Sequence, residues 1–353
     1  MTPPLPQSPV SAAHPAAMTT VNTKGMDERN FRPKTLASFI GQEQMKITLS
    51  MMTRSATKRQ RTIEHLAFFG GPGLGKTTLA SVVANEMGSR MHELAAPSVS
   101  KPGDLAGVLT QLMPGDVLFL DECHALSRDV AETLYSAMED FKINIMLNDK
   151  KPPLRMTLHP FTLIGSTTDF GRLPAPMRAR FGQTFHLQPY TIEQLKQIIE
   201  RAAEKLDFFT EAASLEAIAL RSRNTPRIAL RLLRRCVDAA VDQDEDFIDA
   251  DLVEATMPLL GLDVMGLEEA DRMYMATLIE VYGGGPAGVR AISVSANLDT
   301  ATAEQVVEPI LLTMGLIART PRGRRITRKG YQHYQSFVLK PAPVKWGKVE
   351  AAD

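Results

Sequence analysis

The pattern of apolar and polar positions divides the chain into a part that alternates between strand and helix and a part that is mainly helical. In the first part, short apolar runs such as LAFFG, DVLFLD and FTLIGST are separated by segments of helical periodicity such as TTLASVVANEM and VAETLYSAMEDF. Apolar runs of this kind are typical of strands buried on both faces of a parallel sheet that helices flank. The pattern therefore predicts an α/β domain, to which we assign residues 26–189.

Two further units follow in the chain. Between residues 190 and 261 the periodicity is helical throughout, as in TIEQLKQIIERAAEKL, which predicts a small helical domain. Residues 262–337 begin with a helix ended by glycines, and VVEPILLTMGLIARTPRGRRIT is typical of helix, strand, tight turn and strand. Residues 1–25 are rich in Pro, Ala, Ser and Thr and, with 338–353, are expected to be tails.

Composition narrows the class of protein. Hydrophobic residues make up 44% of the 353 residues and charged residues 23%, and no apolar run approaches the roughly 20 residues of a membrane helix. We therefore expect a cytoplasmic protein with no membrane contact. Lys+Arg and Asp+Glu are both 40, which excludes a generally polycationic nucleic-acid binder, so that any DNA contact must come from a local patch. The two cysteines, Cys123 and Cys236, lie far apart and fit a reducing compartment.

The stretch GGPGLGKTTLA lies between an apolar run and a helical pattern, and it matches the phosphate-binding loop G-x-x-x-x-G-K-[ST]. In such a loop the backbone N–H groups surround phosphate oxygens, while Lys76 would reach the β and γ phosphates and Thr77 would place a hydroxyl on Mg²⁺. A glycine-rich turn without chemical purpose would not need the strand, lysine, hydroxyl and helix together. The predicted ATP-binding residues of this loop are Gly70, Gly71, Gly73, Leu74, Gly75, Lys76, Thr77 and Thr78.

A second acidic element supports nucleotide hydrolysis. In DVLFLDECHAL a buried strand ends in Asp121 and Glu122. Asp121 would hold the Mg²⁺ ion with its water shell, and Glu122 would polarise an attacking water. The alternative is a strand that simply ends in solvent-facing acids, which the upstream loop disfavours. Cys123 and His124 cannot by themselves close a metal coordination shell, so we interpret Cys123 as a packing residue.

Taken in order, RPKTLASFIGQ, GGPGLGKTTLA, KPGDLAGVLT, DVLFLDECHAL, LYSAMEDF, FTLIGSTTDFGRLPAPMRARFG, TPRIALRLLRR and ARTPRGRRIT resemble the RuvB family. These proteins are ring-forming AAA+ motors of Holliday-junction branch migration. The resemblance covers about residues 30–333. It implies an α/β AAA+ P-loop domain, a small helical lid and a C-terminal winged-helix domain. It also implies an ATP-driven hexamer that uses Mg²⁺ to move duplex DNA in recombination and repair.

The resemblance also implies roles for single residues of the ATPase site. Phe39 and Ile40, with Tyr190 after the sheet domain, would line the adenine pocket, although ordinary core packing explains each of them equally well. Thr168 resembles the sensor-1 residue beside the γ phosphate and the attacking water. A threonine at the end of a strand is otherwise a common β-former. Arg227, at the start of a lid helix, resembles sensor 2, which would report on the γ phosphate.

Arg180, in the stretch MRARFG, matches the arginine finger that in this family reaches the neighbouring subunit's site. Arg178 is the competing candidate. A guanidinium has the fork geometry and permanent charge that such a role needs, but a solvated surface arginine is the default explanation for either. A finger supplied from outside requires adjacent subunits, so the resemblance implies a homohexamer.

The DNA-binding and partner-binding residues are expected in two separate segments of the chain. Between Arg319 and Lys329 six residues are basic and none is acidic. A two-strand wing there would track phosphates without reading bases, although a solvated basic hairpin is the alternative. The candidate DNA-binding residues are Arg319, Arg322, Arg324 and Arg325. In the family the hairpin that here carries Met146 and Leu147 docks onto RuvA, and a RuvC-like resolvase would join indirectly.

Several positions depart from the family pattern: Cys123, where an aliphatic residue is typical, Ala125 and Asp169, where arginine is typical, Gly71, where proline is common, and the tip of the hairpin. None removes an expected phosphate, Mg²⁺ or water contact, but they put the usual partner in doubt and leave room for a diverged copy with another loader. A clamp-loader-like ATPase would instead carry a helical collar in place of the basic wing. A non-catalytic DNA-binding scaffold would be expected to lose Lys76, Glu122 or the finger.

Overall fold

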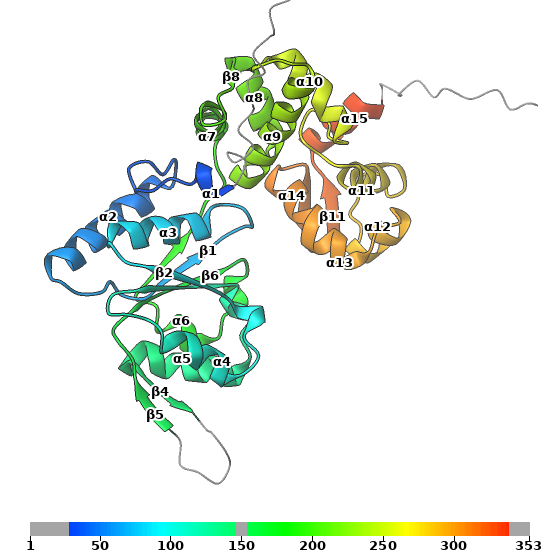
Figure 1. The fold of residues 1–353 in the computed structure, drawn as a ribbon. Helices are drawn as coiled ribbons and strands as arrows, with labels where there is room; N and C mark the ends of the chain where they lie inside the picture. Colours follow the sequence, from blue (N-terminus) through cyan, green and yellow to red (C-terminus); the bar gives the residue numbers. More distant parts are fainter. Residues whose placement is uncertain (1–27, 146–153, 339–353) are drawn as a thin grey trace, which may run out of the picture.

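The computed structural model describes residues 28–145 and 154–338, which form a parallel-sheet unit, a helical lid and a winged-helix unit (Figure 1). These are the three units that the sequence predicts, so the expected fold class is confirmed. Within the described residues, no helix is both long and apolar enough to cross a membrane. The hairpin residues Met146 and Leu147 and both tails lie outside the described residues.

The first unit is built on a five-stranded parallel sheet in the order β2-β3-β6-β1-β7. Its strands are β1 (Leu66–Phe69), β2 (Met91–Ala95), β3 (Val117–Asp121), β6 (Thr162–Thr167) and β7 (Gln183–His186). All six residues of β6 are buried, as are the first four of β3, which explains their continuous apolar sequences. Because the strands are parallel, β1, β3 and β6 all end at the same edge of the sheet, where the phosphate loop and the acidic pair begin.

Helices cover both faces of this sheet and pack into two apolar cores. The longer ones are α2 (Glu43–Lys58), α3 (Lys76–Glu86), α4 (Pro102–Leu109) and α5 (Arg128–Asp140), and α6 (Ala175–Arg178) is short, whereas the short helix α1 (Glu28–Phe31) lies beside the lid. Single 3₁₀ turns lie at Ala96–Ser98, Cys123–Ala125 and Phe170–Arg172. The predicted hairpin is present as β4 (Lys142–Ile145) paired antiparallel with β5 (Leu154–Thr157).

The lid consists of four helices, and it shares an apolar core with one face of the sheet unit. Its elements are α7 (Ile192–Glu204), β8 (Phe209–Thr210), α8 (Ala212–Arg221), α9 (Pro226–Asp242), β9 (Phe247–Ile248) and α10 (Ala250–Leu259). The expectation of helix throughout was wrong at β8 and β9, which pair in parallel over two residues each. So short a pairing leaves no periodicity in the sequence.

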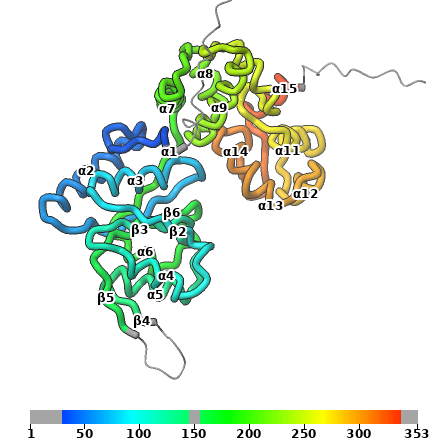
Figure 2. The backbone as a smooth tube through the Cα atoms, in the orientation of Figure 1, coloured from blue at the N-terminus to red at the C-terminus, as the bar shows by residue number. Residues whose placement is uncertain are grey.

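The N-terminal segment crosses from the sheet unit to the lid (Figure 2). Arg201 on α7 donates to the Ser38 carbonyl at 2.9 Å, and Lys205 donates to the Asn30 carbonyl at 2.9 Å. The lid therefore holds this segment over the edge of the sheet where the phosphate loop lies.

The third unit contains the predicted wing. Its elements are α11 (Glu269–Glu280), α12 (Val289–Ser295), α13 (Thr300–Thr302), a π-helical turn (Ala303–Val307), α14 (Glu308–Thr313), β10 (Ile317–Thr320), β11 (Gly323–Ile326) and α15 (Arg328–Val338). Strands β10 and β11 form the antiparallel hairpin that the Pro-Arg-Gly turn indicated, with Arg319 opposite Arg324. Helix α15, which packs on α11, is an addition that the sequence pattern did not reveal.

Candidate functional site

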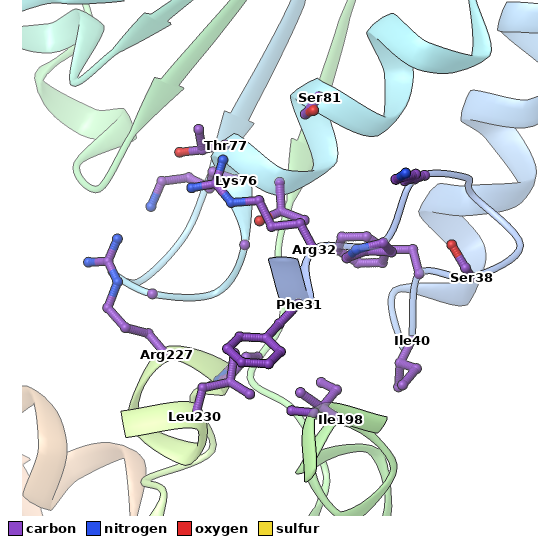
Figure 3. A pocket seen from close by; sticks show the side chains of 18 of the residues that line it. Phe31, Arg32, Ser38, Ile40, Lys76, Thr77, Ser81, Ile198, Arg227 and Leu230 are labelled. Carbon is purple, nitrogen blue, oxygen red and sulfur yellow. The ribbon is translucent and has the colours of Figure 1, made fainter. Parts of the chain in front are cut away.

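A cavity with a volume of about 1490 Å³ lies between the sheet edge, the N-terminal segment and the lid (Figure 3). Most of the predicted ATP-site residues line it: Phe39, Ile40, Gly73, Gly75, Lys76, Thr77, Thr78, Asp121, Glu122, Thr168, Tyr190 and Arg227. Residues from separate parts of the chain thus meet around one space. Gly70, Gly71, Leu74 and Arg180 do not line it.

The phosphate loop has the backbone shape that its glycines permit. Gly70, Gly73 and Gly75 have φ values of 144°, 75° and 96°, which side-chain-bearing residues rarely adopt. A Cβ on Gly70 would also lie 2.7 Å from the Leu187 carbonyl oxygen. Gly71, by contrast, has ordinary φ, and a Cβ there would meet only the Leu74 side chain, at 3.6 Å or more. The departure from the family at Gly71 therefore leaves the loop geometry unchanged.

Lys76 lies at the start of α3 with its amine folded over the loop. Its Nζ donates to the carbonyls of Gly70 at 2.9 Å and Gly71 at 3.0 Å, and the residue is buried. Burial lowers the pKa of Lys76, and the nearby carboxylates of Glu122 and Asp121 partly oppose that shift. No side chain of the described residues caps the N-terminus of α3, so its first N–H groups face the cavity with the loop.

The acidic pair divides into two environments. The Asp121 carboxylate accepts the Ser166 hydroxyl and the Glu122 backbone N–H. Glu122 adopts a left-handed backbone, with φ of 49°. Its carboxylate accepts both the backbone N–H and the hydroxyl of Thr168 at 3.1 Å, and His124 Nδ1 lies 3.2 Å from the same oxygen. Glu122 is thereby held against the predicted sensor.

His124 and Thr167 extend this network, which sequence reasoning missed. His124 Nδ1 lies 2.8 Å from the Thr167 hydroxyl, and that hydroxyl also accepts the Asp169 N–H. The only signal in the sequence was the position of His124 directly after the acidic strand end. Cys123, the other residue considered there, is buried in the core, and burial raises the pKa of its thiol to about 12. The packing interpretation of Cys123 is confirmed.

The cavity wall at the other end of the loop is largely apolar. Phe39 and Tyr190 are almost fully buried, and on Gly75 a Cβ would touch the Phe39 ring at 3.6 Å. The Tyr190 hydroxyl donates to the Leu74 carbonyl at 3.3 Å, and burial raises the pKa of this phenol. Ile40 and, from the lid, Ile198 add apolar surface (Figure 3). Such a wall suits a flat, weakly polar ring such as adenine.

Arg227 reaches the cavity from the first turn of α9 and lies on the opposite side of the loop from α3 (Figure 3). The lid touches the loop directly beside it. A Cβ on Gly73 would lie 2.7 Å from Thr225 Cγ2 and 3.0 Å from Arg227 Cβ. Arg32, which the sequence analysis missed, reaches the cavity from the N-terminal segment and adds another positive charge. Its only sequence signal was its place in the RPKTLASFIGQ box.

Arg180 lies away from the cavity of its own chain. Its Nη2 donates to Glu139 at 2.7 Å, its Nη1 donates to the Pro176 carbonyl at 2.8 Å, and its guanidinium carbon lies 4.8 Å from the centre of the Tyr135 ring. Arg178 is exposed, with its guanidinium carbon 6.0 Å from the Phe170 ring centre. Of the two candidates, Arg180 is the one whose position several contacts fix.

The donor groups at the cavity fit a magnesium–nucleotide complex better than a bare metal ion. Among the described residues no group of three or more His, Cys, Asp or Glu side chains is arranged to hold a metal. Thr77 and Asp121 offer one hydroxyl and one carboxylate, and Mg²⁺ commonly takes few protein ligands together with phosphate oxygens and water.

The wing arginines fall into two pairs. Arg324 donates to both carboxylate oxygens of Glu308, at 2.6 and 2.9 Å, and Arg319 donates to the same group at 3.1 Å. Glu308 is fully buried and also accepts the Tyr274 hydroxyl at 2.6 Å. Arg322 and Arg325 are exposed and pair with no acid in the described part of the chain. The wing is therefore tied to the core by one pair and presents the other to solvent.

Comparisons with known proteins cover almost all of the described chain. Residues 31–187 match the model of the Holliday junction DNA helicase RuvB P-loop domain, residues 190–263 the RuvB AAA lid domain, and residues 264–335 the RuvB C-terminal winged helix domain.

Individual relatives agree with these family matches. The Holliday junction branch migration complex subunit RuvB of Thermotoga maritima is 47% identical over 310 residues, which are 87% of this chain and 92% of the relative. The corresponding subunit of Oenococcus oeni is 46% identical over the same shares of both chains. A solved structure of the Thermotoga maritima RuvB Holliday junction branch migration motor is 44% identical and superposes with a TM-score of 0.76, covering 89% of this chain and 99% of that one.

Proposed function

The chain belongs to the RuvB family, and on that premise we propose that it is an ATP-driven motor that moves duplex DNA and so drives branch migration of Holliday junctions. The observation that carries this proposal is the single cavity in which the phosphate loop, Glu122, Thr168 and the lid residue Arg227 meet. ATP hydrolysis there can alter how the lid lies on the loop. The lid in turn carries the winged helix.

The chain's own residues divide the work of hydrolysis. The loop N–H groups and Lys76 bind the β and γ phosphates, while Thr77 and Asp121 would hold Mg²⁺, which supplies charge neutralisation when bound. Thr168 lies beside the γ phosphate and contacts it. Glu122 accepts the proton of the attacking water. Phe39, Ile40 and Tyr190 hold the adenine, and Arg227 reports whether the γ phosphate is present.

We further propose a homohexamer in which Arg180 completes the site of the neighbouring subunit. Arg180 is outside the cavity of its own chain, which supports a role in an adjacent one. The DNA partners are the duplex arms of a four-way junction. A RuvA-like junction-binding protein, contacting Met146 and Leu147, and indirectly a RuvC-like resolvase are the proposed protein partners. We place the complex in the cytoplasm.

The proposal is tested by mixing the purified protein with a synthetic four-way junction, Mg²⁺ and ATP, with and without RuvA. We expect dissociation of the junction into duplexes with ATP and none with a non-hydrolysable analogue. A clamp-loader-like ATPase, the main alternative, would hydrolyse ATP but leave junctions intact while assembling a ring-shaped clamp. ATP hydrolysis without any junction dissociation, even with RuvA, would contradict the branch-migration proposal.

The wing provides a separate prediction. Arg322→Ala is expected to weaken binding to duplex DNA similarly for all sequences, because phosphate contacts carry no sequence information. The slope of log K against log salt should become shallower by about 0.9, the value for one lost phosphate contact on B-DNA. The measurement is a titration of fluorescent duplexes at several salt concentrations.

The matched control is Arg290→Ala, which removes the same charge from α12 of the same unit, outside the wing. Its salt slope should equal that of the parent. A loss of binding that depends strongly on DNA sequence would mean that Arg322 reads bases, contrary to phosphate tracking.

A further inference from the structure

Residues 223–227 run from the connection between α8 and α9 into the first turn of α9, and they contact the nucleotide cavity at one end and the winged-helix unit at the other. At the cavity end, Thr225 and Arg227 pack on Gly73 of the phosphate loop. At the other end, the Arg223 side chain leaves the lid and enters the winged-helix unit.

The Arg223 guanidinium makes a buried connection across the boundary between the two units. Its Nε donates to the Gly266 carbonyl at 2.7 Å, and its Nη2 donates to Asp271 on α11 at 2.9 Å, with Glu268 at 3.4 Å. The Arg223 side chain is 9% exposed and that of Asp271 is 3% exposed. Separating a buried, hydrogen-bonded ion pair leaves two poorly solvated charges, which strongly disfavours movement of one unit without the other.

The backbone of residues 223–227 is also fixed. Arg223 and Asn224 both adopt left-handed backbone conformations, with φ of 51° and 56°. Asn224 is held from both sides by Tyr190: its carbonyl accepts the Tyr190 N–H at 3.0 Å, and its side-chain amide donates to the Tyr190 carbonyl at 2.8 Å. Consecutive non-glycine residues keep this conformation only where their surroundings determine it. A displacement at Arg227 is therefore passed along these residues rather than absorbed by them.

Hydrogen bonds also fix the segment between the lid and the winged-helix unit, residues 263–267. The Asp263 carboxylate accepts the N–H groups of Met265 and Leu267 at 2.8 and 2.9 Å and lies 2.8 Å from His333 on α15. Gly266 has φ of 75°, and a Cβ there would clash with the Arg221 backbone. This connection is a packed joint and not a flexible tether.

We infer that Arg223, through Asp271, is a positioning residue that makes the winged-helix unit move with the lid, so that a change at Arg227 reaches the DNA-binding wing. The coupling between the nucleotide site and DNA rests on the proposed function, since it matters only in a motor that moves DNA. The rigid joint between the lid and the winged-helix unit does not depend on that function.

The rigid joint is tested by measuring the distance between spin labels at Glu216→Cys on α8 and Val294→Cys on α12, both exposed positions, by double electron–electron resonance. The native cysteines are buried, and their pKa values of about 12 keep them unreactive. When labelled protein is diluted with an excess of unlabelled subunits, so that a ring carries at most one labelled copy, the full-length parent should give one narrow distance distribution. Arg223→Ala should broaden it or add a second distance.

The same variants test the coupling. With Arg223→Ala, hydrolysis of ATP in the absence of DNA should stay at the parent rate, whereas its stimulation by duplex DNA should fall about tenfold, within the usual range of coupling between two sites. Junctions dissociated per ATP hydrolysed should fall in parallel. Asp271→Asn, which keeps the acceptor that caps α11, serves as a second variant if Arg223→Ala does not fold.

The matched control is Glu254→Gln. It breaks the pair with Arg221 at 2.7 Å, which is also buried on the arginine side but lies entirely within the lid. This variant should keep the narrow distance and the parent coupling. A parent-like distance distribution, or parent-like stimulation by DNA, in whichever of Arg223→Ala and Asp271→Asn folds would overturn the inference. A parent that fails to dissociate junctions while the distances behave as expected would instead count against the proposed function.

Discussion

Glu122→Gln is expected to bind ATP and DNA as the parent does and to lower the rate of ATP hydrolysis about 10²- to 10⁴-fold, the usual contribution of a general base. The amide keeps the size of the side chain and one acceptor for Thr168, whose N–H and hydroxyl lie 3.1 Å from the Glu122 carboxylate. It cannot accept a proton from water. Binding is measured with a fluorescent ATP analogue and labelled duplex, and turnover by phosphate release.

The control for this variant is Glu132→Gln, the same chemical change at an exposed position of α5. It should leave the hydrolysis rate unchanged. A parent-like rate in Glu122→Gln would show that another group accepts the proton, and the assignment of Glu122 would fail.

Arg180→Ala is expected to reduce ATP hydrolysis about 10³-fold or more, the usual effect of losing an arginine finger, without weakening nucleotide binding to its own chain. The guanidinium is outside the cavity of its own chain, where it is oriented by Glu139, by Pro176 and by the Tyr135 ring. We therefore expect this charge to act in the site of a neighbouring subunit, where it would stabilise charge that develops in the transition state.

Mixed rings decide whether this arginine acts between subunits. Equal amounts of Arg180→Ala and Glu122→Gln should together recover about a quarter of parent activity, because in a randomly mixed ring about one interface in four joins an intact Glu122 to an intact Arg180. Recovery requires that subunits exchange. No recovery despite demonstrated mixing would show that Arg180 acts within its own chain. Arg178→Ala is the matched control and should retain most activity; if it alone abolishes turnover and complements Glu122→Gln, the finger is Arg178.

The phosphate loop shows how much of a site local sequence determines. Its glycine spacing, the lysine and the hydroxyl are consecutive in the chain, and the flanking strand and helix follow from apolar runs beside them. The loop geometry is a property of neighbouring residues, so the pattern was enough to predict it. The same holds for the wing, where a Pro-Arg-Gly turn fixes which strands pair.

Contacts between side chains that are far apart in the sequence could not be predicted in this way. Glu308 forms ion pairs with Arg319 and Arg324 and is completely buried in the structure. In the sequence it is one acidic residue in an otherwise apolar helix, and nothing there indicates its burial. From the basic residues counted in the sequence, all four wing arginines were predicted to bind DNA alike. The structure separates them by whether this one carboxylate is within reach.

The sequence by itself determined the three units, the phosphate loop and the acidic strand end, because each depends on residues adjacent in the chain or on a repeating period. Only the tertiary structure decided which arginines are bound, where Arg180 lies relative to its own cavity, and that Arg223 spans 48 residues of sequence to reach Asp271. The reason is physical: an ion pair depends on distance in space and on exclusion of water. Both the distance between the two charges and their exclusion from water depend on how the chain packs, and the order of residues alone does not give them.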